Sequence, residues 1–136
     1  MFSIILVSHA EVASSMIDSV QMVMGDQKQL CAFEVMPGDS PDELVKLLEQ
    51  MLTAAMQSGD VVVLSDFSLG TPFNMLCSLM QKHDFYHLTG MNLPMLINLL
   101  KNRQNGLSVQ ISCRAAIDAA RTQIFDVIEF VKELSD

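Results

Sequence analysis

The sequence is short of basic residues, and this shortage limits the partners it can have. Its 136 residues include 8 Lys and Arg against 16 Asp and Glu, for a formal net charge of −8. Nucleic acid is therefore disfavoured as a partner, because phosphate backbones bind clustered Lys and Arg side chains. A basic protein partner is compatible with this charge.

Long apolar runs and closely spaced cysteines are also missing. No apolar run reaches the roughly 18 residues that span a bilayer, and the N-terminus lacks the basic region and cleavage site of a signal peptide. Cys31, Cys77 and Cys113 form no CxxC pair, which argues against a zinc site or a disulfide framework. We interpret them as reduced thiols and expect a cytoplasmic location.

The remaining composition is typical of a globular protein. Half of the residues are hydrophobic and 18% are charged. No linker, repeat or low-complexity segment interrupts the chain, so we expect one domain over residues 1–136.

Apolar runs and helical spacings alternate along the sequence. We expect strands at 2–8, 30–35, 61–64 and 85–89, and helices at 11–24, 41–58, 72–82, 94–102 and 108–122. This order predicts an α/β fold, a doubly wound and mostly parallel sheet with helices on both faces. Segment 124–131 is dense in bulky apolar side chains and fits either a last strand or more helix.

Polar side chains gather where three of the expected strands end. His9 follows Ser8 after the first strand, Asp66 follows Ser65 after the third, and Asn92 follows the fourth. Open α/β sheets place their chemistry at the carboxyl ends of the strands. We therefore expect these loops to converge.

His9 and Asp66 are the pair with a chemical interpretation. A carboxylate beside an imidazole fixes its tautomer and leaves the other ring nitrogen free to attack. Thr71 and Pro72 begin a helix, whose N-terminus favours an anion. A nucleophile, an orienting carboxylate and an anion site together fit phosphoryl transfer through a phosphohistidine.

Structural roles compete with this interpretation. A lone histidine at a strand end is more often structural than chemical, Asp66 could be an N-cap or a loop residue, and Asn92 could simply shape a helix entry. His83 and His87 lie four residues apart and suggest a metal pair. The stretch between them looks like a helix exit rather than a continuous helix, so we predict no metal site.

Several segments point to one family when they are taken together and in order. They are Ile4–His9, Val35–Ser40, Leu64–Asp66, Gly70–Asn74 and Gly90–Leu96. With these segments the chain resembles, over essentially its whole length, the IIA component of the mannose-type sugar phosphotransferase system.

The resemblance implies a phosphoryl carrier. His9 would be the phosphorylated residue, with Asp66 holding Nδ1 while Nε2 takes the phosphoryl group from the carrier protein HPr. The group would then pass to the IIB component, and from there to sugar entering through the membrane components IIC and IID. No metal or cofactor is required, because the donor is already a phosphohistidine.

The remaining site residues and the assembly are expectations of the same kind. The hydroxyl groups of Ser8, Ser65 and Thr71 are expected to hydrogen-bond the phosphoryl oxygens, and Asn92 to shape the pocket. The family forms homodimers that exchange a C-terminal strand, which implies an edge strand within 124–131. The usual Ala/Pro-rich linker to IIB is missing, so IIB is expected as a separate chain.

Alternatives stay open beside this reading. The phosphotransfer subunit of dihydroxyacetone kinase shares the fold and a strand-end histidine, although Gly70–Asn74 favours the sugar-transport branch. A receiver-like regulatory module is less compatible, because receivers place an acidic pair where this chain has Ser8 and His9. The chain also departs from the family pattern: Ala10 stands where glycine is common, and the loop Phe67–Gly70 lacks the familiar tryptophan.

Overall fold

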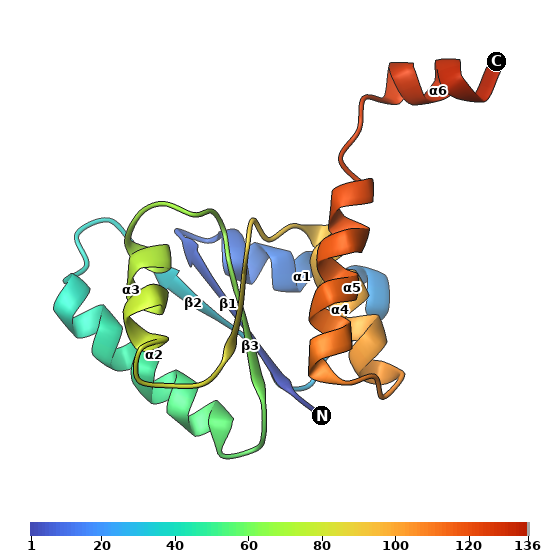
Figure 1. The fold of residues 1–136 in the computed structure, drawn as a ribbon. Helices are drawn as coiled ribbons and strands as arrows, with labels where there is room; N and C mark the ends of the chain where they lie inside the picture. The colour runs from blue at the N-terminus through green and yellow to red at the C-terminus, as the bar shows by residue number, and fades with distance from the viewer. Residues whose placement is uncertain (136) are drawn as a thin grey trace.

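One parallel β-sheet lies between two layers of helices (Figure 1). The computed structural model describes residues 1–135. The strands are β1 (Ser3–His9), β2 (Leu30–Val35), β3 (Val61–Ser65) and β4 (Tyr86–Thr89). The helices are α1 (Val12–Met24), α2 (Pro41–Met56), α3 (Thr71–Leu79), α4 (Leu93–Gln104), α5 (Val109–Thr122) and α6 (Val127–Ser135).

The strands are hydrogen-bonded in the order β2-β1-β3-β4, and each neighbouring pair is parallel. The two central strands, β1 and β3, are buried along their length, with only His9 partly exposed. Uninterrupted apolar runs such as Val61–Leu64 are typical of strands that are covered on both faces. The chain runs from β1 outward to β2 and then returns to β3 on the other side of β1. The strand order therefore reverses between β1 and β3.

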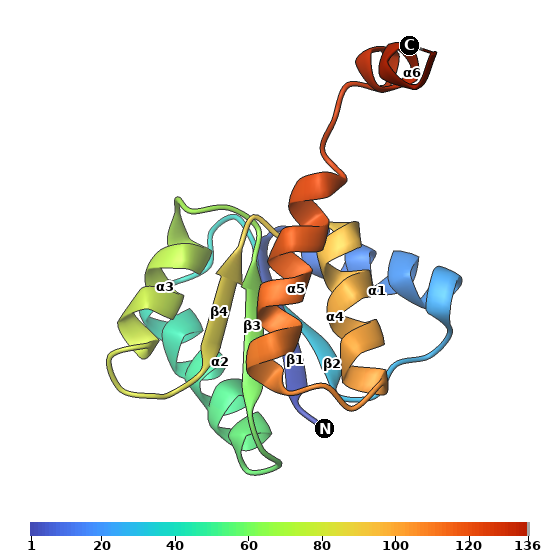
Figure 2. The same ribbon diagram turned by 45° about the vertical axis from the view of Figure 1, so that its right-hand side comes forward.

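Two hydrophobic cores flank the sheet. Helices α1, α4 and α5 cover one face, and α2 and α3 cover the other (Figures 1 and 2). Ile4 and Leu6 of β1 pack into the first core, whereas Ile5 and Val7 pack into the second. Because side chains alternate along a strand, His9 lies on the same side as Ile5 and Val7, which is the side of α3.

The predicted α/β fold is confirmed, with a fully parallel sheet and helices on both faces. The boundaries differ by a few residues, as is usual where helix ends fray. β1 extends to include His9, α3 ends at Leu79 instead of residue 82, and α4 continues to Gln104. No helix within residues 1–135 is long and apolar enough to cross a membrane.

Segment 124–131 forms no strand in the described single chain; α6 begins at Val127, which is the helical alternative for this segment. Asp126 begins this helix: its Oδ1 accepts the N–H groups of Ile128 (2.8 Å) and Glu129 (3.2 Å). A strand needs a neighbouring edge for its backbone hydrogen bonds, whereas a helix supplies its own. The helix stands away from the rest of the molecule in both views (Figures 1 and 2). Its bulky apolar side chains are exposed, namely Val127, Ile128, Phe130, Val131 and Leu134.

Candidate active site

His9 and Asp66 meet where the strand order reverses. His9 is the last residue of β1 and Asp66 directly follows β3, and Val7 of β1 is in register with Ser65 of β3. The carboxyl ends of two parallel neighbours around such a reversal form the crevice in which open α/β sheets bind ligands. The topology therefore accounts for the meeting of two residues that are 57 positions apart.

The Asp66 carboxylate is held by three donors. Its Oδ2 accepts the backbone N–H of His9 at 2.8 Å and also contacts His9 Nδ1 at 2.8 Å. Its Oδ1 accepts the backbone N–H of Phe67 at 3.0 Å. The Asp66 side chain is 12% exposed and the His9 side chain 41% exposed. The carboxylate is thus fixed inside the site while the imidazole remains open to a partner.

These contacts decide the protonation of the pair. Burial raises the pKa of Asp66, but the N–H groups of His9 and Phe67 and the His9 ring outweigh it and leave that pKa below its usual value. An ionised carboxylate can only accept hydrogen bonds. Nδ1 of His9 therefore carries the ring proton and donates a hydrogen bond to Asp66. In the neutral ring, Nε2 then keeps a free electron pair.

Gly70 lies beside this free nitrogen. A Cβ atom added at Gly70 would stand 2.7 Å from His9 Nε2 and 2.9 Å from Cε1, and the residue has a φ of +88°. Real Cβ atoms do not approach neighbouring atoms this closely. The absence of a side chain at position 70 therefore keeps space open next to Nε2, directly before the first residue of α3.

The N-terminus of α3 is the free helix end at the site. At α1, Ser8 Oγ accepts the N–H of Ala13 (2.9 Å) and Glu34 Oε2 accepts the N–H of Ser14 (3.1 Å). At α3, by contrast, no described side chain caps the helix start. The first N–H groups of a helix have no carbonyl partner within it and attract anions. Pro72 has no N–H group and the N–H of Asn74 donates to Gly70 O (3.0 Å), so α3 offers an anion the N–H groups of Thr71 and Phe73.

Thr71 is another of the residues that the sequence predicts to bind the phosphoryl group. It begins α3 immediately after Gly70 and is partly buried.

The other three residues in that prediction have internal partners. Ser8 Oγ donates to Ala10 O (3.1 Å) and accepts from Ala13 N–H, on the α1 side of the sheet. Asn92 Oδ1 accepts the N–H of Met95 (2.9 Å) and so caps α4. The third, Ser65, has both of its contacts on β4.

Ser65 belongs to a small polar cluster beside the site. Its hydroxyl lies 2.8 Å from His87 Nε2 and 2.9 Å from Thr89 Oγ1. Burial lowers the pKa of His87. His83 is engaged elsewhere, 2.8 Å from Glu49 Oε2. The two histidines thus have separate partners, and within residues 1–135 no group of three or more His, Cys, Asp or Glu is arranged to hold a metal ion.

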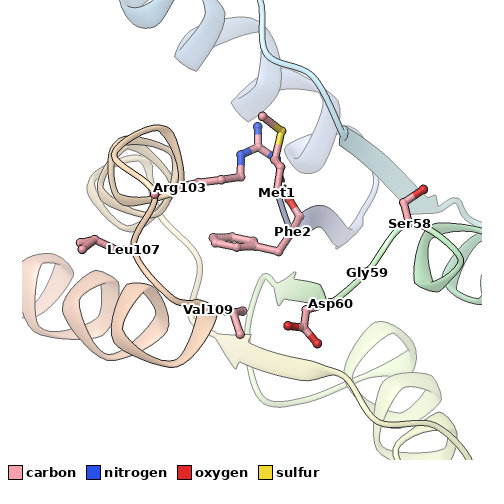
Figure 3. Close-up of a pocket in the computed structure, with 9 residues that line it drawn as sticks. Met1, Phe2, Ser58, Gly59, Asp60, Arg103, Leu107 and Val109 are labelled. Atoms are coloured by element: carbon pink, nitrogen blue, oxygen red, sulfur yellow. Dashed lines mark hydrogen bonds between the residues drawn. The ribbon is translucent and has the colours of Figure 1, made fainter.

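A cavity lies at the opposite end of the sheet from His9 and Asp66. It measures about 390 Å³ and is lined by residues that precede β1 and β3, including Phe2 and Asp60, together with Arg103 of α4 (Figure 3). The Arg103 side chain is buried, and its guanidinium donates to the carbonyl oxygens of Phe2 (3.0 Å), Gln29 (3.2 Å) and Lys28 (2.6 Å). These bonds tie α4 to the start of β1 and β2, so we assign Arg103 to structure.

A comparison with known families identifies the family of this chain. The model of the family described as PTS system fructose IIA component matches residues 3–117. The chain belongs to this IIA family. The match includes His9, Asp66, Gly70 and Thr71, and it ends within α5, so α6 lies beyond it. The resemblance inferred from the sequence is thereby confirmed at the level of the family.

Individual relatives of this IIA protein agree with that assignment. The mannose-specific EIIAB component of Escherichia coli K12 is 23% identical over 120 residues, which are 88% of this chain but 37% of that relative. The chain thus spans a little over a third of its length. The sorbose-specific EIIA component of Klebsiella pneumoniae is 29% identical over 111 residues, which are 81% of this chain and 80% of that protein.

Solved structures show the same fold. Component EIIA of the phosphotransferase system from Streptococcus agalactiae has a TM-score of 0.84 at 24% identity, and covers 95% of this chain and 99% of that one. The mannose/sorbose-specific IIA subunit from Enterococcus faecalis has a TM-score of 0.77 at 21% identity, covering 92% of this chain and 93% of that one. At these identities the likeness concerns the architecture.

Sequence reasoning on this IIA protein missed two residues beside His9. Gly70 was treated as part of a motif, although its closeness to Nε2 depends on its positive φ. Phe67 was noted as a departure from the family pattern, and its ring packs on the imidazole. Ala10 has a φ of +49°, in the left-handed region. That conformation explains why glycine suits the position.

Proposed function

We propose that this chain is a phosphoryl carrier of a sugar phosphotransferase system, with His9 as the residue that is phosphorylated. The observation that carries the proposal is the His9–Asp66 pair, in which a largely covered carboxylate holds Nδ1 at 2.8 Å while the imidazole is 41% exposed and its Nε2 lies beside Gly70. Membership of the IIA family supports it.

The transfer step follows from this geometry. The electron pair of His9 Nε2 attacks the phosphorus of phospho-HPr, a new N–P bond forms, and the N–P bond to the donor histidine breaks. The electron pair of the broken bond stays on the donor's imidazole. The ring of His9 gains positive character, which the Asp66 carboxylate stabilises. Thr71 and the first N–H groups of α3 bind the phosphoryl oxygens.

The acceptor and the assembly belong to the same proposal. The phosphoryl group would leave His9 for a IIB component by the reverse of the step above, and the membrane components IIC and IID would complete the coupling to sugar uptake. This role places the protein in the cytoplasm. A homodimer remains a prediction of the resemblance, and the exposed apolar side chains of α6 offer surface for it.

Incubation with phospho-HPr tests the proposal. We expect mass spectrometry at neutral pH to find one phosphoryl group per chain, on the peptide that contains His9, and we expect acid to remove it. A chain that stays unlabelled while the same phospho-HPr labels a known IIA protein would overturn the proposal. So would a label on a different residue.

Replacing Asp66 by Asn is expected to slow phosphorylation by about 10- to 100-fold while the fold is retained. The amide is isosteric, but it loses the charge that fixes the proton on Nδ1 and stabilises the cationic ring. Single-turnover labelling by phospho-HPr measures the rate, and circular dichroism measures the fold.

Asp18→Asn is the matched control for this variant. It removes the same charge from an exposed position on α1 and is expected to leave the rate unchanged. Equal rates for Asp66→Asn and Asp18→Asn would contradict the orienting role of Asp66.

A further inference from the structure

Phe67 packs against the His9 imidazole. The two ring centroids are 5.2 Å apart, and the ring planes are inclined by 32°. The Phe67 ring does this from an exposed loop, since 48% of the residue is accessible to solvent. The other half of its surface is covered, and the His9 ring is among the groups that it contacts.

The loop from Asp66 to Gly70 surrounds the imidazole with three of its residues. Asp66 binds Nδ1, Gly70 lies beside Nε2, and the Phe67 ring packs against the imidazole. Phe67 also donates its backbone N–H to Asp66 Oδ1 at 3.0 Å. Its main chain and its side chain therefore act on the two members of the same pair.

The hydrogen bond between Nδ1 and Asp66 is lost whenever the imidazole turns about its second torsion. The second side-chain torsion of histidine has two broad energy wells, so the ring can rotate about the Cβ–Cγ bond. A rotation of 180° would bring the ring carbon Cδ2 to the position of Nδ1 beside Asp66. It would also bring Cε1 to the position of Nε2 beside Gly70. Besides that hydrogen bond, a second ring packed against the imidazole opposes this turn, because the turning ring would have to pass it.

We propose that Phe67 is a positioning residue for His9, which holds the imidazole with Nδ1 toward Asp66 and Nε2 toward Gly70. The proposal rests on the proposed function, in which Nε2 accepts the phosphoryl group. Phe67 acts on the ring before the donor arrives, so its effect exists in the free protein. Loss of an aromatic contact of this kind is expected to change the fraction of time that the ring is correctly oriented by a factor of about 3 to 10.

Nuclear magnetic resonance of the His9 ring in the free protein tests the positioning directly. In Phe67→Ala we expect the proton on Nδ1 to exchange with water about 3- to 10-fold faster, because the ring leaves Asp66 more often. Phe67→Tyr restores the ring contact and is expected to restore slow exchange. Leu69→Ala removes a side chain that is 68% exposed in the same loop, and is expected to change nothing. Unchanged exchange in Phe67→Ala would overturn the proposal.

Kinetics separate positioning from docking. A positioning role predicts that Phe67→Ala lowers kcat for phosphorylation about 3- to 10-fold and leaves KM for phospho-HPr unchanged. A rise in KM at constant kcat would instead make Phe67 part of the docking surface, and would overturn the proposal.

The exchange measurement needs no phosphoryl donor. If the wild-type chain took no phosphoryl group, the proposed function would fail, and the role of Phe67 in ordering the ring would still be decided.

Discussion

A His9→Gln variant is expected to take up no detectable phosphoryl group from phospho-HPr. Glutamine retains the backbone N–H that Asp66 Oδ2 accepts, so the turn after β1 keeps that bond. Its amide nitrogen, however, has no free electron pair with which to attack phosphorus, because that pair is delocalised into the carbonyl. Neutral-pH mass spectrometry after incubation with phospho-HPr measures the outcome, and thermal unfolding checks the fold.

Two other histidines provide the comparison. His83→Gln alters a histidine that is paired with Glu49, and full labelling is expected. His87→Gln alters the histidine beside Ser65, close to the site, and labelling of His9 is again expected. If the label persisted in His9→Gln and vanished in His87→Gln, the phosphorylated residue would be His87 and the assignment to His9 would be wrong.

The fold was predictable because its central strands carry a strong local pattern. Val61–Leu64 is a short, β-branched apolar run, and such a run between helical segments indicates a buried parallel strand. Once β1 and β3 are parallel neighbours, their carboxyl ends meet, and the proximity of His9 to Asp66 follows. The pair could therefore be predicted from two strand ends without knowledge of any side-chain conformation.

The partners of the serine hydroxyl groups were harder to predict. Ser8 and His9 are adjacent in sequence, yet alternation along β1 sends them to opposite faces of the sheet. Ser8 consequently contacts the start of α1, while His9 faces the loop before α3. The alternation of side chains along β1 already separates Ser8 from His9. It predicts their partners only once it is known which helices cover which face of the sheet.

The C-terminal segment shows where local pattern is insufficient. Bulky apolar residues over 124–131 fit a strand or a helix equally well, because the choice depends on whether an edge is present to pair with. In the single chain, Asp126 caps a helix and the apolar side chains of α6 remain exposed. The structure of this segment is therefore set by its surroundings more than by its composition.

Replacing Gly70 by Ala is expected to lower the rate of phosphorylation by about 100-fold or more. The new methyl group would stand 2.7 Å from His9 Nε2, so either the ring or the loop must move away from the productive geometry. A displacement of about 1 Å at a reacting atom is enough for a loss of this size. The methyl group would also occupy the space that the phosphoryl group needs on its way to the N-terminus of α3. Single-turnover labelling with phospho-HPr gives the rate.

Gly25→Ala isolates this contact from backbone strain. Gly25 ends α1 with φ 81° and ψ −177°, close to the φ 88° and ψ −174° of Gly70. Nothing lies within 4 Å of its added Cβ. Alanine in this region of backbone space is expected to destabilise either variant by about 1–3 kcal/mol, which unfolding by urea measures. After correction for the folded fraction, only Gly70→Ala should phosphorylate slowly. Equal rates for the two variants would show that the phosphoryl group does not occupy the space beside Gly70. The phosphoryl site would then have to lie on the other side of the imidazole.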